Sequence, residues 1–116
     1  MKRGDLYWAT LDPRSGSEQK GRRPVLVLSH DAFNQTANWR SIIVVPLSTS
    51  PIQARRAPTV VPLAAGTAGL TVASCVVCHQ ITTLDRTNLS ERIGALPPKL
   101  LGQVEAALLS AVDIRR

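Results

Sequence analysis

The sequence predicts a mainly β domain of the α+β kind: a small, strongly curved antiparallel sheet or barrel followed by a C-terminal helix. Three observations lead to this prediction. The chain has 116 residues, enough for one domain spanning residues 1–116. Short apolar runs rich in valine alternate with loops along most of the chain. Near the C-terminus the apolar spacing changes to three and four residues, which is typical of an amphipathic helix.

The first strand is expected at residues 5–11, where apolar side chains alternate with small or polar ones. A near-continuous apolar run at residues 23–29 indicates a strand that is buried on both faces. Residues 41–47 are rich in β-branched side chains, and Pro46 lies near the end of that run, where a missing ladder donor is tolerated. Three further strands are expected at residues 59–63, 74–84 and 91–96.

Two helical segments are expected beside these strands. Asp31 is placed to act as the N-cap of a short helical turn. The C-terminal helix is expected to open around Lys99, because Pro98 suits the first turn of a helix. Its apolar residues form one stripe that would cover the core: Leu100, Leu101, Val104, Ala107, Leu108, Ala111 and Val112.

The composition favours a polyanionic partner. The formal net charge is +6 and the sequence pI is near 10.4, which fits nucleic acid or an acidic protein. Aromatic residues make up only 3% of the chain, which argues against a broad platform for stacking bases. The hydrophobic content of 44% is high for a small basic domain, so we expect a second subunit to cover some apolar surface.

The chain shows neither a membrane-span pattern nor a signal peptide, so we expect a cytoplasmic protein with no membrane partner.

The two cysteines, Cys75 and Cys78, form a C-x-x-C pair followed by His79. A structural zinc site needs four ligands, and only His30 and His79 remain to complete one. The pair also lies in an apolar run, where residues three apart in a strand point to opposite faces. We therefore expect two buried thiols and no metal.

A polar loop bounded by Gly16 and Gly21 leads directly into the second expected strand. Arg23 lies at this junction, and Pro24 after it restricts Arg23 to extended backbone angles. An arginine held in this way can present a planar, permanently charged fork to a phosphate. Arg23 is the leading candidate for a phosphate contact, with Lys20 and Arg22 beside it.

Other polar residues follow or interrupt apolar strands. Ser48-Thr49-Ser50 could hydrogen-bond a phosphate, although such hydroxyls are also ordinary turn residues. His79 titrates near neutrality and could act as an acid or base, or be a half-buried packing residue. Basic residues that could extend a positive groove are Arg40, Arg55, Arg56 and Arg86. The chain contains no P-loop, dinucleotide fingerprint or paired metal carboxylates.

In combination, several segments resemble the MazF/PemK group of toxin–antitoxin endoribonucleases. They are the blocks at residues 2–8, 11–13, 16–29, 44–50, 75–81 and 83–86, with Gly94 and the terminal helix. Their order and spacing cover essentially the whole chain, and the Gly-Ser-Glu-Gln block followed by Arg-Pro-Val-Leu-Val and Val-Pro-Leu-Ser is specific in combination.

The resemblance implies an SH3-like barrel, usually homodimeric, that cleaves single-stranded RNA selectively without a metal or other cofactor. Arg23 matches the family's catalytic arginine, and Ser48 matches a position that is usually threonine, for which Thr49 could substitute. Some members place an arginine and an aspartate in the strand where this chain has Val77 and His79. Thr82 also replaces a usual arginine, and these departures draw attention to His79.

The resemblance leads to a mechanism in which the RNA supplies its own nucleophile, the 2′-OH. Arg23 and Ser48 would stabilise the phosphate charge, and Glu18 or His79 would move protons. Candidate RNA-binding residues are Gln19, Lys20, Arg22, Asn34, Thr49, Arg55, Arg56 and Gln80. An acidic antitoxin is the expected protein partner. Two alternatives stay open: a gyrase inhibitor resembling CcdB, and an RNA-binding module that does not cut.

Overall fold

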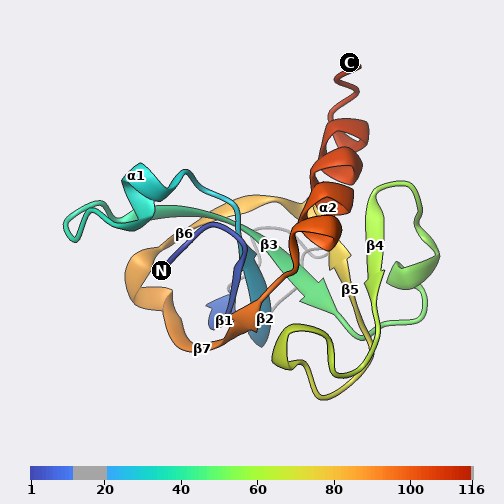
Figure 1. The fold of residues 1–116 in the computed structure, drawn as a ribbon, viewed down its shortest axis with the longest axis horizontal. Coiled ribbons are helices and arrows are strands. Elements are labelled where there is room, and N and C mark those ends of the chain that lie inside the picture. The colour runs from blue at the N-terminus through green and yellow to red at the C-terminus, as the bar shows by residue number, and fades with distance from the viewer. Residues whose placement is uncertain (12–20, 116) are drawn as a thin grey trace.

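Strand β3 is the centre of the computed structural model, which describes residues 1–11 and 21–115 (Figure 1). The strands are β1 (Asp5–Leu11), β2 (Gly21–Val27), β3 (Ser41–Ser48), β4 (Val60–Leu63), β5 (Ser74–Val77), β6 (Thr82–Asp85) and β7 (Leu89–Ala95). Among the described residues, every strand pairing is antiparallel, in the order β4-β5-β3-β2-β1-β7, and β6 also pairs with β3.

Strand β3 joins two parts of the sheet because different stretches of it pair with different neighbours. Residues 41–44 pair with β6, residues 44–46 pair with β2, and residues 47–48 pair with β5. The strand therefore runs from the α1 side of the molecule to the smaller β4–β5 side (Figure 1). Polar residues that follow its C-terminal end are thereby carried to the junction of the two parts.

Two larger apolar clusters fill the curved sheet, and a third, small one consists of Val60, Cys75 and Val77. The larger of the two combines residues of β1, β2, β3, β4 and β5, with Leu6, Leu26 and Val76 fully buried. The smaller of the two lies on the other face of β1, β2 and β3 and includes Val25, Val27 and Ile42. Strand β2 thus contributes to both clusters, as the continuous apolar run predicted.

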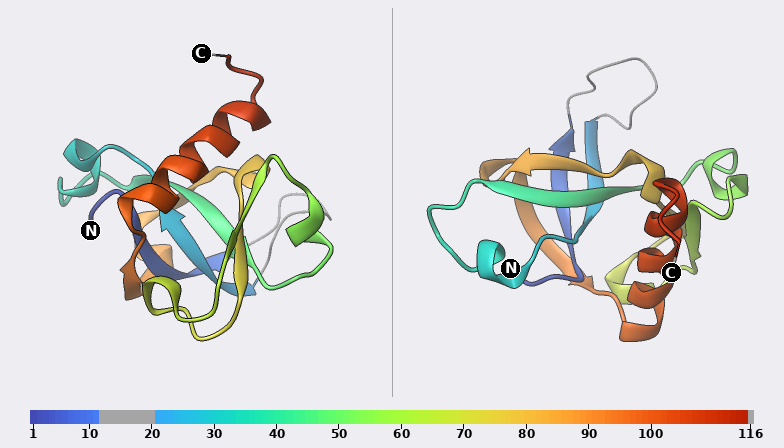
Figure 2. Two further views of the ribbon diagram at one scale, coloured as in Figure 1. Left: turned by 45° about the vertical axis from the view of Figure 1, so that its right-hand side comes forward. Right: turned by 90° about the horizontal axis from the view of Figure 1, so that it is seen from above.

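Helix α2 (Pro98–Ala111) covers the larger cluster. Val104 and Ala107 are buried against the cluster, and Leu100, Leu101 and Leu108 pack beside them. The C-terminal end of α2 extends beyond the strands (Figure 2), and Val112 just after it is 53% exposed. In the described part of the chain, no helix is long and apolar enough to cross a membrane.

The predicted fold class is confirmed, and most strand bounds agree within a few residues. One expectation is wrong: residues 74–84 do not form a continuous strand. The chain forms β5, then a 3₁₀ turn at Cys78–Gln80, and then β6. The break arises because β5 and β6 pair with different ends of β3, and the Cys78 N–H donates to the carbonyl of Thr59 at 2.9 Å.

The short helix α1 (Asp31–Asn34) is present, but its N-cap is His30 and not Asp31. Nδ1 of His30 accepts the N–H of Ala32 at 2.9 Å. The Asp31 carboxylate accepts the backbone N–H of Arg3 at 2.6 Å and therefore ties α1 to the N-terminal segment. This hydrogen bond is the main cause of a lowered pKa at Asp31.

Candidate functional site

Arg23 lies near the start of β2, opposite Ala9 of β1 in the strand register. The neighbouring pairs are Thr10 with Arg22 and Trp8 with Pro24. The backbone of Arg23 is therefore part of a regular antiparallel ladder, and its side chain is half-buried. Arg23 is thus the third residue of β2, two residues inside the strand and not at its junction, and the preceding loop expected at residues 16–20 lies outside the described residues.

A cleft of about 320 Å³ opens beside this arginine. Arg22, Arg23 and Trp8 line one side, and Ser48 with Thr49 lies at the end of β3. The Arg22 guanidinium lies 4.3 Å from the centre of the Trp8 ring, a cation–π contact that fixes its orientation. The structure thus brings four of the sequence-predicted site residues into one cleft, with both arginines beside the hydroxyls.

The two hydroxyl residues at the end of β3 differ in exposure. Ser48 is only 4% exposed, and its Oγ accepts the N–H of Ser50 at 3.0 Å. Because a hydroxyl has one proton to give as well, Ser48 keeps a donor after this bond is made. Thr49 is exposed and also lines the cleft.

Part of the cleft wall depends on a close approach between the backbone around Gly69 and the backbone around Gly94. A Cβ on Gly94 of β7 would lie 2.1 Å from the carbonyl oxygen of Ala68, and one on Gly69 would lie 2.5 Å from that of Ile93. Gly69 also has a φ of +86°, which favours glycine. These contacts hold the turn at Thr67–Gly69 against β7, and residues 69–72 form part of the cleft wall.

A second, more open hollow of about 520 Å³ adjoins the first. It shares Ser48, Thr49 and Ser74 with the arginine cleft and continues over Ala54 and Pro62. Its lining contains no charged residue among those described. The two hollows therefore differ in character: one is cationic and the other is neutral, with several hydroxyls.

His79 lies away from this cleft. Ser48 pairs with Cys75 at the start of β5, and His79 follows four residues later, beyond the other end of that strand. The separation along the chain path is roughly 10 Å. Nδ1 of His79 lies 2.9 Å from Oγ1 of Thr59, and partial burial followed by the charge of Arg56 lowers the pKa of the imidazole below its usual value.

The structure therefore separates the expected site into two groups. One is the arginine cleft, defined by Arg22, Arg23, Ser48 and Thr49. The other is the histidine cluster, defined by Arg56, Thr59 and His79. Arg55 is exposed beside this cluster in sequence, and Gln80 is half-buried in the same 3₁₀ turn as His79.

Asn34, expected among the RNA contacts, is 2% exposed. Its Nδ2 donates to the Ser29 carbonyl at 2.7 Å and to Asp31 at 3.1 Å, while its Oδ1 accepts from the Ser29 hydroxyl. These bonds hold α1 against the end of β2. The side chain is occupied and buried, so we correct its assignment from an RNA contact to a structural one.

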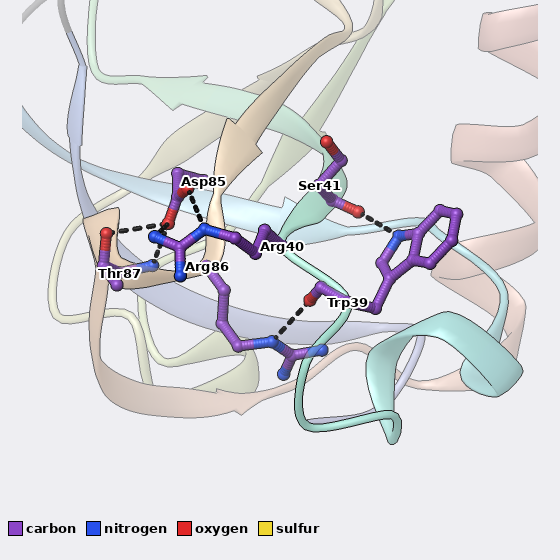
Figure 3. Close-up of polar contacts among 6 residues, drawn as sticks. All are labelled: Trp39, Arg40, Ser41, Asp85, Arg86 and Thr87. Carbon is purple, nitrogen blue, oxygen red and sulfur yellow. Dashed lines mark hydrogen bonds and ion pairs between the residues drawn. The ribbon is translucent and has the colours of Figure 1, made fainter.

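Arg40 and Arg86 also have structural partners (Figure 3). Arg40 donates to both carboxylate oxygens of Asp85, at 3.0 and 3.1 Å. Arg86 donates to the carbonyls of Trp39, Phe33 and Thr36, at 2.9 to 3.1 Å. Both arginines anchor the segment between α1 and β3. We therefore no longer count them among the basic residues that could extend a positive groove.

The thiols of Cys75 and Cys78 are free and buried, as expected. Cys75 lies in β5 and packs with Val60 and Val77, whereas Cys78 begins the 3₁₀ turn and belongs to the larger cluster, so the two thiols do not lie on opposite faces of one strand. Burial raises the pKa of Cys78 to about 11, with the nearby Cys75 adding to the rise. In the described residues, no group of three or more His, Cys, Asp or Glu side chains is placed to hold a metal ion.

Three candidates, Glu18, Gln19 and Lys20, lie outside the described residues. Two residues that sequence reasoning did not select are part of the observed groups: Trp8 in the arginine cleft and Thr59 in the histidine cluster. Pairing of the first two predicted strands across their loop would have placed Trp8 near Pro24. No sequence signal pointed to Thr59, because its contact with His79 depends on how β4 and β5 pair.

The described residues form a small, mainly β domain with an antiparallel sheet, a terminal helix and a cationic cleft, and comparison with known proteins identifies the family. Residues 2–112 match the model of the PemK-like, MazF-like toxins of type II toxin–antitoxin systems. The chain belongs to this family, and the resemblance found in the sequence is confirmed.

Named relatives span nearly the full chain. The chain is 37% identical over 108 residues to Endoribonuclease EndoA of Bacillus subtilis (strain 168), covering 93% of this chain and 90% of that one. The crystal structure of MazF (Form-I) from Deinococcus radiodurans superimposes with a TM-score of 0.79 at 31% identity, covering 97% of this chain and 96% of that one. A MazE–MazF complex (Form-II) from the same organism gives a TM-score of 0.73 at 28% identity, covering 99% and 97%.

Proposed function

We propose that this protein is an endoribonuclease, the toxin of a toxin–antitoxin pair, and that it cleaves single-stranded RNA in the arginine cleft. The observation that carries the proposal is the meeting of Arg23 with Ser48 and Thr49 in one cleft of a MazF-like fold. A relative over nearly the whole chain is named an endoribonuclease. The alternative of a gyrase inhibitor gives this cationic cleft no role.

In the proposed reaction the RNA supplies the nucleophile. The 2′-OH attacks the adjacent phosphorus, the 5′-oxygen of the next nucleotide leaves, and the products are a 2′,3′-cyclic phosphate and a 5′-OH end. The enzyme must hold these atoms in line and stabilise the extra negative charge of the transition state. Arg23 provides a fixed cation with donors for two phosphoryl oxygens. The Ser48 hydroxyl donates to the same phosphate, and Thr49 is the more exposed hydroxyl beside it.

The proposed reaction also needs a residue that transfers protons. Glu18 and His79 are the two candidates, and His79 lies outside the arginine cleft of its own chain. We therefore place Glu18 first as the proton-transfer group and give His79 a part in binding RNA. The expected RNA contacts are Gln19, Lys20, Arg22, Thr49, Arg55, Arg56 and Gln80.

The neutral hollow next to the arginine cleft is suited to hold the base of a nucleotide next to the cleaved bond. It shares Ser48 and Thr49 with the cleft, so a nucleotide with its phosphate near Arg23 can place its base there. The exposed Thr49 hydroxyl can donate to or accept from a base edge there, whereas the Ser74 hydroxyl donates to the Val72 carbonyl at 3.1 Å and remains an acceptor.

We also propose a homodimer and an acidic antitoxin as protein partners, acting in the cytoplasm. The charge of +6 favours an acidic partner, and a similar structure contains MazE bound to MazF. A disordered acidic tail that folds over the arginine cleft would compete with RNA.

A digest of mixed-sequence RNA by the purified protein tests this proposal. Cleavage in excess EDTA, with 5′-OH and cyclic-phosphate ends, is the expected result. Ends carrying 5′-phosphate and 3′-OH would indicate a water nucleophile and contradict the mechanism. Binding without cleavage, or inhibition of gyrase, would support one of the two alternatives.

A further inference from the structure

The two histidines of this chain make opposite hydrogen bonds through the same ring atom. Nδ1 of His30 accepts a backbone N–H, that of Ala32, at 2.9 Å. A neutral imidazole has one N–H, so His30 must carry its proton on Nε2. His79 instead places Nδ1 against a hydroxyl, Oγ1 of Thr59, at the same distance of 2.9 Å.

The partners of Thr59 decide which atom donates in the His79 contact. Oγ1 of Thr59 lies 3.0 Å from the carbonyl oxygen of Arg56, which can only accept. The hydroxyl has a single proton. If it donates to Arg56, Nδ1 of His79 donates to Oγ1 and two hydrogen bonds form. If it donates to Nδ1, only one forms, so the first arrangement is favoured.

We infer that Thr59 is a positioning residue that keeps the proton of neutral His79 on Nδ1, so that Nε2 is left as an acceptor for a ribose hydroxyl of bound RNA. This inference rests on the proposed function for its ligand, while the tautomer rests on the geometry alone. The ribose 2′-OH is the group that distinguishes RNA from DNA, and it can donate to such an acceptor.

Three further observations support the inference. The carbonyl of Thr59 accepts the N–H of Cys78, so Thr59 anchors the 3₁₀ turn through its backbone as well as its side chain. His79 is exposed, which leaves its ring within reach of RNA. Arg56 lies close enough to lower the pKa of His79, after the larger effect of partial burial, and it supplies a cation for the adjoining phosphate. Ribose and phosphate contacts would therefore lie side by side.

Nitrogen NMR of the histidine side chains at alkaline pH tests the tautomer in the intact protein. We expect the proton on Nδ1 in His79 and on Nε2 in His30, which serves as an internal control. Thr59→Val removes the hydroxyl at nearly constant shape and should raise the population of His79 with its proton on Nε2. Thr59→Ser keeps the hydroxyl and should restore the wild-type pattern. Equal tautomers in the two histidines, or no change in Thr59→Val, would overturn the inference.

Binding to a set of RNA oligonucleotides, each with one ribose replaced by 2′-deoxyribose, tests the ligand. One position away from the cut should weaken binding to the wild type by about 2- to 10-fold, the value of one hydrogen bond. His79→Ala should lose this sensitivity, Thr59→Val should reduce it, and Thr59→Ser should keep it. Equal sensitivity in the wild type and His79→Ala would overturn the ribose contact. A wild type that neither binds nor cuts RNA would instead refute the proposed function and leave the tautomer result standing.

Discussion

The arginine cleft and the histidine cluster contain similar polar groups, but the fold holds them in different ways. Arg23 and Ser48 belong to strands whose backbones are paired with a neighbouring strand. Arg56 and Thr59 lie in the loop before β4, and His79 is the exposed residue of a short 3₁₀ turn. Transition-state charge is best stabilised by groups that do not have to reorganise. We therefore propose that the chemical step takes place in the cleft and that the cluster contributes only to RNA binding.

The largest expected effect is on the cleavage rate, and it comes from a substitution in the arginine cleft. Arg23→Ala should lower the single-turnover cleavage rate by at least ~10²-fold, the scale for loss of one preorganised donor. Circular dichroism should show an unchanged fold, because the side chain is not part of any of the three apolar clusters. Arg22→Ala is the matched control and should cost only about 2- to 5-fold, since it removes an exposed cation–π contact. Equal effects of the two variants would mean that Arg23 has no special role.

The rigidity of the cleft wall can be tested through Gly94. Gly94→Ala places a methyl group against the backbone of Ala68 and should lower the free energy of unfolding by about 1–3 kcal/mol. Cleavage should fall as the wall that contains residues 69–72 is displaced. Denaturant unfolding and cleavage assays on the same samples measure the two effects. Gly102→Ala is the matched control, because a Cβ at Gly102 meets no atom within 4 Å. If Gly94→Ala left both quantities unchanged, the close approach would not shape the cleft.

The histidine cluster should affect how RNA binding depends on pH. Partial burial, and then the positive charge of Arg56, lower the pKa of His79, so the neutral ring persists to a lower pH than usual. Arg56→Ala removes the charge, raises this pKa, and should move the loss of His79-dependent binding to higher pH. Proton NMR titration of His79, together with the pH profile of RNA affinity, provides the measurement. Arg55→Ala is the control, and a shift of equal size in that variant would exclude a specific effect of Arg56.

The smallest expected effect concerns the thiols, which belong to neither region. Burial raises the pKa of Cys75, and that of Cys78 to about 11, so little thiolate exists at neutral pH. A thiol reagent should leave both cysteines unmodified in the folded protein and modify both in guanidinium chloride. Cys78→Ala should still cut RNA. Rapid labelling of the native protein would show that the segment after β5 opens readily.

The sequence was sufficient to predict the fold, and it marked Arg23 as the leading candidate for the site. Valine-rich runs and the spacing of the terminal helix are local signals, and Arg23 was marked by the loop before it and by Pro24 after it. The break within residues 74–84 could not be predicted, because it depends on which part of β3 each segment pairs with. The contact between Thr59 and His79 likewise depends on the pairing of β4 with β5. The hydrogen bonds of Asn34 are local, to Ser29 and Asp31, and its residue type gave no sign of them. From residue type alone, both His79 and Asn34 were candidate site residues. Only the fold showed that His79 is exposed and that Asn34 is buried.

A double-mutant cycle between Arg23 and His79 tests the central claim most directly. Single-turnover cleavage at subsaturating enzyme would be measured for the wild type, Arg23→Ala, His79→Ala and the double variant. If the cleft and the cluster act separately, the two losses should add in free energy to within about 0.5 kcal/mol, as for distant sites with no shared partner. His79→Ala alone should cost no more than about 10-fold, since it removes one hydrogen bond. If His79→Ala alone slows cleavage but the double variant is no slower than Arg23→Ala, both residues belong to one catalytic constellation, which would contradict the proposed separation of cleft and cluster.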